Sequence, residues 1–277
     1  MKDGARRAAP LPWGRYGLRA AALSYLALAL AAPLLVIVED GVKDGLQALW
    51  GAITEPAALH ALWLTLWTAA IMAVVNAAMG TLVAYVLVRY DFPGRRFVDA
   101  MIDLPLATPT LVTGVMLVAL YGPQTALGGW LRRDVGFPII YAPPGIVLAL
   151  LFLSLPLVVR AVQPVLQDLD REPEDAAATL GASAFTVFRR VTLPALRGPV
   201  ATGTLLAFAR ALGEFGSIVI VAGNIPLRTQ TAAVYVLGEV ESDNRRAASA
   251  MSLALLAVTF ALFLIIDWRT RRRTEAP

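Results

Sequence analysis

Long apolar runs alternate with short polar connections along almost the whole chain. Each run approaches or exceeds the roughly 20 residues that a helix needs to cross the hydrocarbon layer of a membrane. Backbone polar groups find no water in lipid, so we expect every run to be helical. The runs comprise residues 20–38, 61–88, 100–121, 145–162, 200–222 and 247–266. The pattern therefore predicts an all-α integral membrane protein with six transmembrane helices.

The first apolar run has a second interpretation. Arg6 and Arg7 precede it, and residues 27–29 (Ala-Leu-Ala) have the small-residue pattern of a signal-peptide cleavage site. Because the apolar run continues well past that point, an uncleaved membrane anchor is favoured.

The distribution of Lys and Arg between the connections predicts how the helices are oriented. With six spans, 17 of the 24 basic residues lie on one side of the membrane and six on the other, while Arg210 lies inside a span. The positive-inside tendency places the more basic side, which includes both termini and residues 160–198, in the cytoplasm. We expect one transmembrane domain over residues 20–268, a loosely ordered cytoplasmic tail over residues 1–19 and a basic cytoplasmic tail over residues 269–277.

The composition agrees with a membrane protein and argues against several kinds of chemistry. Hydrophobic residues make up 58% of the chain, charged residues 16%, and the mean hydropathy is +0.66. The net charge of +4 follows from the topology, with basic side chains against lipid headgroups, and does not indicate a nucleic-acid partner. With no cysteine and only His60, the chain is predicted to hold no metal. Neither Lys2 nor Lys43 follows a glycine in a phosphate-binding loop, so we expect no catalytic residue, no bound cofactor and no ATP hydrolysis in this chain.

A polar-flanked segment between the fourth and fifth spans, residues 174–194, has the pattern of two short helices. Pro173 is expected at the first helical position, and Gly181 is expected to end the first helix in a left-handed conformation. Ser183 then caps the second helix, and Pro194 is expected to stop it. In a membrane protein, such a bend predicts a docking surface for a soluble partner.

This segment resembles the EAA loop of ABC importer permeases. That loop has Glu-Ala-Ala, three residues, Gly, nine residues, then an aliphatic residue, any residue and Leu-Pro. Here Asp175 stands in the Glu place with Glu174 just before it, so either carboxylate could serve. The alanines that follow leave one helix face nearly flat, open to close approach by another protein. The resemblance implies EAA coupling helices within a coupling loop of residues 163–198, with contacts to an ATPase through Glu174, Asp175, Ala176, Ala177, Gly181, Leu193 and Pro194.

Prolines in the third span predict a weakened helix. Pro105 and Pro109 each delete a backbone donor and loosen the helix around Thr108 and Thr110. A broken helix inside a transporter is commonly where polar cargo meets backbone groups. An ordinary proline kink is an equal alternative.

Charges within the fifth span mark a second candidate for the translocation pathway or its gate. Arg210 and Glu214 are spaced i to i+4, so on a helix they share one face and can pair. The pair could steer an anion or clamp helices together, and a structural or gating role is favoured because a carboxylate repels a dianion. Ser217 follows among glycines that permit close packing. Beyond the span, Asn224 and Arg228 could line the outer mouth, touch a delivery protein or lie in an ordinary exposed loop.

Two further features lie outside these candidates. Asp99 and Asp103 begin the third span, and Arg160 lies at the corresponding end of the fourth, where snorkelling to the interface is the favoured account of the arginine. Residues 231–240 are moderately apolar but too short to cross the bilayer, so they could lie in the interface or dip into the protein.

Over nearly its whole length after the tail, the chain resembles the T-type permease subunits of sulfate/thiosulfate importers. The similarity rests on residues 88–96, 102–109, 159–165 and 210–216. Molybdate permeases look similar too, particularly across residues 222–226 and 228–231. The alternatives are thus a molybdate or tungstate permease and, in another class, a secondary anion transporter driven by an ion gradient, in which the EAA spacing would have no purpose.

The resemblance also implies how the chain works and with which partners. It implies a permease of the bacterial inner membrane that moves sulfate or thiosulfate into the cytoplasm by alternating access. The implied partners are a second permease of the W type, two ATPase subunits that bind ATP and Mg²⁺, and a periplasmic sulfate-binding protein. Discrimination between anions is then expected to belong mainly to the binding protein.

Overall fold

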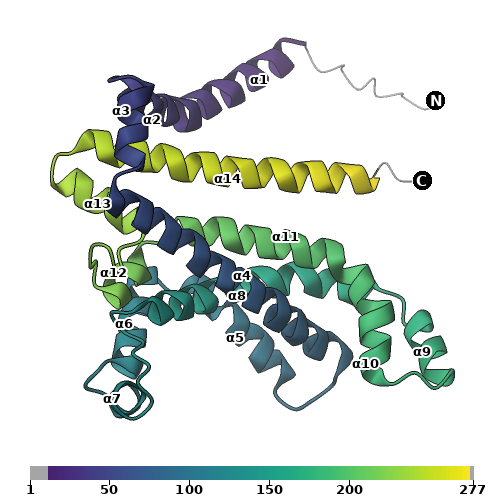
Figure 1. The fold of residues 1–277 in the computed structure, drawn as a ribbon. Coiled ribbons are helices and arrows are strands. Elements are labelled where there is room, and N and C mark those ends of the chain that lie inside the picture. The colour runs from purple at the N-terminus through teal and green to yellow at the C-terminus, as the bar shows by residue number, and fades with distance from the viewer. Residues whose placement is uncertain (1–11, 275–277) are drawn as a thin grey trace, which may run out of the picture.

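The computed structural model describes residues 12–274, and side chains from residue 16 to residue 264. Within that part, the chain consists of helices and their connections, without a β-strand (Figure 1). The prediction of an all-α fold is therefore confirmed. Many large apolar side chains on the outside of the helices are exposed, as expected of surfaces that face lipid.

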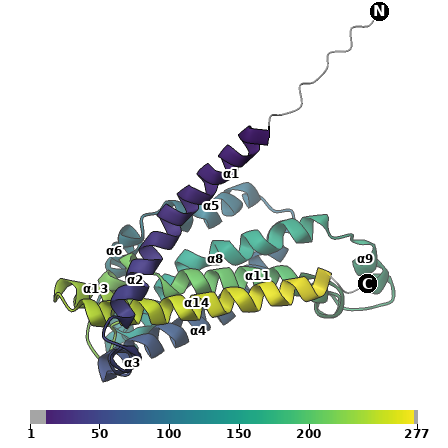
Figure 2. The ribbon, with the colours of Figure 1, turned by 90° about the horizontal axis from the view of Figure 1, so that it is seen from above.

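The N-terminal arm is a long helix that extends away from the rest of the molecule (Figure 2). It comprises α1 (Pro12–Leu26), a π-helical turn η1 (Ala27–Ala31) and α2 (Ala32–Val42). Part of the tail expected to be loosely ordered is helical, because α1 already begins at Pro12. Residues 1–11 lie outside the described part. At its far end the arm packs on α14 (Arg245–Thr274), where Gly41 makes room for the side chain of Leu253.

Three long helices form the centre of the bundle: α4 (Pro56–Arg89), α8 (Pro143–Asp168) and α11 (Leu193–Leu212). Small residues set their spacing. A Cβ added at Gly80 of α4 would lie 2.8 Å from the Cβ of Val158, and one added at Gly203 of α11 would lie 2.9 Å from the Cα of that valine. The three backbones therefore approach closely around one residue of α8, as is common between membrane helices.

Two of the expected spans are bent. The third consists of α5 (Arg95–Ala107) and α6 (Thr110–Tyr121), which meet at 111°. The fifth consists of α11 and α12 (Gly216–Ala222), with a bend of 65° measured from Ala184 onward. Among the described residues, four helices are long and apolar enough to cross a membrane, or six elements if each bent pair counts as one span.

The remaining elements lie at the two ends of the long helices. At one end, α9 (Glu172–Thr179), α10 (Ala184–Val187) and the π-helical turn η2 (Phe188–Thr192) make the loop between α8 and α11 (Figure 1). At the other end lie α3 (Leu46–Ile53), α7 (Ala126–Arg133) and α13 (Ala232–Glu241). The apolar stretch at residues 231–240 is thus a short helix, packed against α14 and α4.

Helix α8 joins these two ends directly. It begins beside α7 and ends three residues before α9, and its 26 residues correspond to a length of about 39 Å. The predicted basic tail at residues 269–277 continues α14 as far as Thr274, and its last three residues lie outside the described part.

Candidate functional site

The bend in the predicted docking segment is built by a left-handed glycine. Gly181 has φ of 84°, as expected, and ends α9. The N–H of Ala182 donates to the carbonyl of Ala177 at 3.1 Å, and the N–H of Gly181 donates to Ala178 at 2.9 Å. These two bonds form a Schellman motif, which satisfies the last carbonyls of the helix and fixes the turn. Helix α9 begins at Glu172, one residue before the predicted start.

The second helix of the segment starts as predicted but does not stop where it was expected to. The Ser183 hydroxyl accepts a bond from the N–H of Thr186 at 3.3 Å and caps α10. The prediction that Pro194 ends this helix is wrong, because the backbone stays helical from α10 through η2 into α11. In η2 the N–H of Leu193 donates to Phe188, five residues back, and this wide turn admits a proline without an N–H.

The two adjacent carboxylates of α9 have different surroundings. Glu174 Oε1 lies 3.1 Å from Arg89 Nη2 and accepts a hydrogen bond from the Thr192 hydroxyl at 2.8 Å. The side chains of Arg89 and Glu174 are only 7% and 12% exposed. Asp175 is exposed on the outside of the helix. Glu174 therefore ties α9 to α4 and η2, whereas Asp175 faces outward.

Several residues that hold this end of the molecule together were not predicted from the sequence. Arg89 and Thr192 hold Glu174, and the rings of Tyr85 and Phe188 meet edge to face at 5.1 Å between α4 and η2. These pairs join segments far apart in the chain, which no local pattern reveals. Beside the glycine bend, Leu180 and Phe185 are 89% and 70% exposed. Two large apolar side chains in a polar loop were a visible signal for a contact surface.

The two helix breaks come together, because α6 packs against α12. Gly216 at the start of α12 lies directly against the hydroxyl of Thr110 at the start of α6. A Cβ added at Gly114 would lie 2.9 Å from the carbonyl oxygen of Ser217. Thr110 and Ser217 are therefore neighbours. Thr108 lies in the break of the third span and donates its hydroxyl hydrogen to Leu104 of its own helix at 2.8 Å.

The prediction that Arg210 and Glu214 share one helix face is wrong. Helix α11 ends at Leu212, and Glu214 lies in the break between α11 and α12. The two side chains still meet, with Arg210 Nη1 3.4 Å from Glu214 Oε2. The other carboxylate oxygen accepts bonds from the N–H of Ser217 at 3.1 Å and from its hydroxyl at 3.0 Å. A carboxylate in this position caps α12 and offsets the positive end of its dipole.

The surroundings of this pair determine what it can do with an anion. The Glu214 side chain is 4% exposed, whereas that of Arg210 is 32% exposed. The carboxylate is thus enclosed and engaged with Ser217, and the arginine is left with donors at the edge of the break. Such an arrangement can present positive charge to an anion at the break between α11 and α12.

The remaining candidates lie elsewhere. Asn224 and Arg228 are in the connection between α12 and α13, separated from Arg210 by the length of α12. Both are exposed, and the Asn224 side chain accepts a bond from Gln230 at 2.9 Å. The structure therefore places the predicted pathway residues in two groups, one at the breaks and one at an end of the molecule.

The account of Arg160 as a snorkelling side chain is wrong. Arg160 Nη1 lies 2.6 Å from Asp99, and its Nε and Nη2 atoms lie 2.8 and 2.7 Å from the two carboxylate oxygens of Asp103. Two carboxylates on consecutive turns of α5 thus hold the guanidinium in place. The cluster fastens α5 to α8.

The chain matches a known protein family and is similar to two named relatives. Residues 76–274 match the family described as "Binding-protein-dependent transport system inner membrane component". The chain is 41% identical over 246 residues to the "Probable sulfate transport system permease protein cysT" of Nephroselmis olivacea, covering 89% of this chain and 86% of that protein. It is 42% identical over 243 residues to the "Sulfate transport system permease protein CysT" of Synechocystis sp., covering 88% and 85%.

Solved structures share the fold. A chain of a bacterial alginate ABC transporter, in complex with an alginate-bound periplasmic protein, superposes with a TM-score of 0.78 over 95% of this chain and 96% of that chain, at 15% identity. A chain of the MetNI methionine ABC transporter in an inward-facing conformation gives 0.57 over 77% and 94%, at 16% identity. At such identities the likeness extends to the fold alone.

Proposed function

Since this chain belongs to the binding-protein-dependent transport system inner membrane components, we propose that it is the permease through which an ATP-driven importer carries sulfate into the cytoplasm. The names of its relatives, at 41% and 42% identity over most of both chains, support sulfate as the cargo. Thiosulfate has the same charge and a similar shape and is proposed as a second substrate. The partners are a second, W-type permease, two ATPase subunits holding ATP and Mg²⁺, and a periplasmic sulfate-binding protein.

The observation that carries this proposal is the projecting bend of α9 and α10. It combines an exposed carboxylate, Asp175, with the exposed apolar side chains of Leu180 and Phe185. Apolar anchors ringed by polar groups are what a docking surface for another protein requires. The bend is proposed to bind the ATPase in the cytoplasm, in agreement with the excess of Lys and Arg on that side.

The contacts around the bend provide the route by which ATP binding would reach the pathway. Movement of α9 acts on α4 through the pair of Glu174 with Arg89. Movement of α10 acts on α11, because the backbone is helical from one to the other. Helix α11 ends beside the break that contains Glu214. ATP binding by the partner therefore shifts the equilibrium between inward-open and outward-open states by favouring one position of the bend.

The decisive experiment is uptake of radiolabelled sulfate by vesicles that contain the complete reconstituted complex. We expect uptake to require ATP, the binding protein and this chain, and to be competed by thiosulfate. Stronger competition by molybdate would reassign the cargo to the larger tetrahedral dianions. Uptake driven by an ion gradient without an ATPase would make the chain a secondary transporter and end the proposal.

A further inference from the structure

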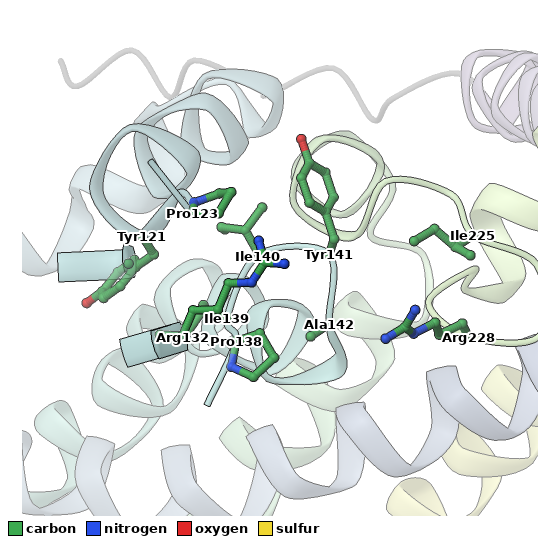
Figure 3. A pocket seen from close by; sticks show the side chains of 11 residues that line it. Tyr121, Pro123, Arg132, Pro138, Ile139, Ile140, Tyr141, Ala142, Ile225 and Arg228 are labelled. Carbon is green, nitrogen blue, oxygen red and sulfur yellow. The ribbon is translucent and has the colours of Figure 1, made fainter. Parts of the chain in front are cut away.

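A basic pocket lies beside α7, at the end of the molecule opposite the bend of α9 and α10 (Figures 1 and 3). Its volume is about 230 Å³, and it is enclosed by the end of α6, by α7 and by the connections before α8 and after α12. Arg132 of α7 and Arg228 enter it from opposite sides, and Tyr141 stands between the two segments that carry them. The pocket was not visible in the sequence, because its two arginines are far apart in the chain.

The charge of the pocket favours an anion. Its lining holds two guanidinium groups and no carboxylate. Among residues 16–264, no ion pair joins Arg132 or Arg228 to an acidic side chain. Guanidinium groups match tetrahedral oxyanions in geometry, because each can donate two parallel hydrogen bonds to two oxygens.

The walls of the pocket are strained in a way that is common at binding sites. Four residues other than glycine have positive φ in the described part of the chain. One of them, Tyr141 at 60°, lines this pocket, and two others, Asn224 at 49° and Leu227 at 56°, directly precede the lining residues Ile225 and Arg228 in the chain. Such conformations cost free energy and persist only where the surrounding structure imposes them.

Buried hydrogen bonds hold these walls in place. The N–H of Tyr141 donates to Val221 of α12 at 2.8 Å. The buried hydroxyl of Thr229 donates to Ala222 at 2.7 Å, and Gln230 donates to Asn224 at 2.9 Å. The loop that carries Arg228 is therefore preorganised, which lowers the entropic cost of binding a ligand.

One short helix connects the pocket to the break beside Arg210. Helix α12 runs from the break beside Arg210 to the loop of Arg228, and its seven residues correspond to about 10 Å. The pocket and the break are thus at the two ends of one short helix. An anion released at the outer mouth would meet Arg132 and Arg228 before Arg210.

We propose that this pocket is the first binding site for the tetrahedral dianion on the permease itself, with Arg132 and Arg228 as its ligands. The proposal rests on the proposed function, because it takes the cargo to be a sulfate-like dianion that enters from this side. The pocket receives the anion from the binding protein, and Arg210 is the next positive charge along the path.

The test compares two measurements on the complete transporter in nanodiscs. The first is equilibrium dialysis with radiolabelled sulfate in the absence of the binding protein. The second is the uptake rate at saturating loaded binding protein, together with the Kd of that protein for the transporter. We expect Arg132→Gln/Arg228→Gln to lower bound sulfate and the uptake rate about tenfold, as loss of charged hydrogen bonds predicts, with a Kd within about twofold of wild type.

The matched control is Arg133→Gln on the same helix. Arg133 donates to the carbonyl of Gly129 at 3.3 Å and does not line the pocket, so this variant should behave as wild type. The proposal falls if the double variant keeps its bound sulfate and its uptake. It also falls if only the Kd weakens and uptake recovers at saturation, since the arginines would then bind an acidic side chain of the binding protein. If the wild-type transporter binds sulfate through these arginines but takes up none, the proposed function is wrong and the pocket is still an anion site.

Discussion

At the scale of single residues, the sequence motif could not show that Glu174 and Asp175 have different surroundings. By spacing, Asp175 occupies the place of the motif carboxylate, yet the enclosed carboxylate is Glu174. One position along a helix turns a side chain by about 100°. That rotation separates an internal ion pair from a surface charge, and only the packing of α4 against α9 decides which is which.

We predict opposite phenotypes for these two neighbours. Glu174→Gln removes the charge that pairs with Arg89, a loss of about 1.5–3 kcal/mol in the free energy of unfolding. Asp175→Asn should change that free energy by less than about 0.5 kcal/mol, as at most surface positions. Thermal unfolding in detergent measures both. Equal losses in the two variants would contradict the assignment of Glu174 as the internal carboxylate.

At the scale of elements, local chemistry was predictable and tertiary contacts were not. The left-handed Gly181, the cap at Ser183 and the break near Pro109 follow from backbone preferences that operate within a few residues. The bend at residues 213–215 contains no proline, so the fifth run was treated as one regular helix. Its cause lies partly in α6, which packs against α12 where glycines allow it. A pattern within one stretch of the sequence cannot show that α6 packs there.

The contact between the two breaks can be tested at Gly216. A Cβ at this position would collide with the hydroxyl of Thr110, so Gly216→Ala should cost about 1–3 kcal/mol through overpacking and lower the uptake rate. Adding Thr110→Ala removes the colliding oxygen and should restore part of both. The control is Gly213→Ala, because a Cβ there meets only the Arg210 carbonyl, at 3.9 Å. A harmless Gly216→Ala would show that α6 and α12 do not pack this closely.

The bend of α9 and α10 can be tested as a docking surface. Ala177→Arg places a long charged side chain on the flat face of α9 and should prevent co-purification with the ATPase, while membrane insertion stays intact. Leu180→Ser removes an exposed apolar anchor, and its expected effect is about 2 kcal/mol of binding free energy, or about thirtyfold in Kd. Ala126→Arg, on exposed α7 at the other end, is the control. Normal co-purification and uptake in Ala177→Arg would contradict the docking role.

At the scale of the whole molecule, the bend of α9 and α10 and the basic pocket lie at opposite ends of α8. If the bend is cytoplasmic, the pocket opens on the other side of the membrane. The distribution of Lys and Arg predicts this orientation. The helical architecture was accessible from hydropathy, and the orientation stays a prediction from charge. The tilt of the N-terminal arm away from the bundle was not predictable, because no pattern within one chain fixes it.

Because the chain contains no cysteine, single cysteines can report this orientation without background. Leu180→Cys and Val135→Cys place a thiol on exposed positions at the two ends. In right-side-out vesicles, we expect a membrane-impermeant maleimide to label the cysteine at position 135 and not the one at position 180. Inside-out vesicles should give the reverse. Labelling of both positions from one side would overturn the proposed topology.

The wide turn at η2 redirects the chain without interrupting its helical backbone. The backbone is helical from Ala184 to Leu212, yet α10 stands steeply to α11 at this turn (Figure 1). A push on α10 therefore acts on α11 as on the long arm of a bent lever. About 26 Å of helix separates Leu193 from Arg210, so a tilt of α11 by about 10° about its first turn displaces Arg210 by about 4 to 5 Å. A displacement of that size is enough to carry a guanidinium group into or out of contact with a passing anion.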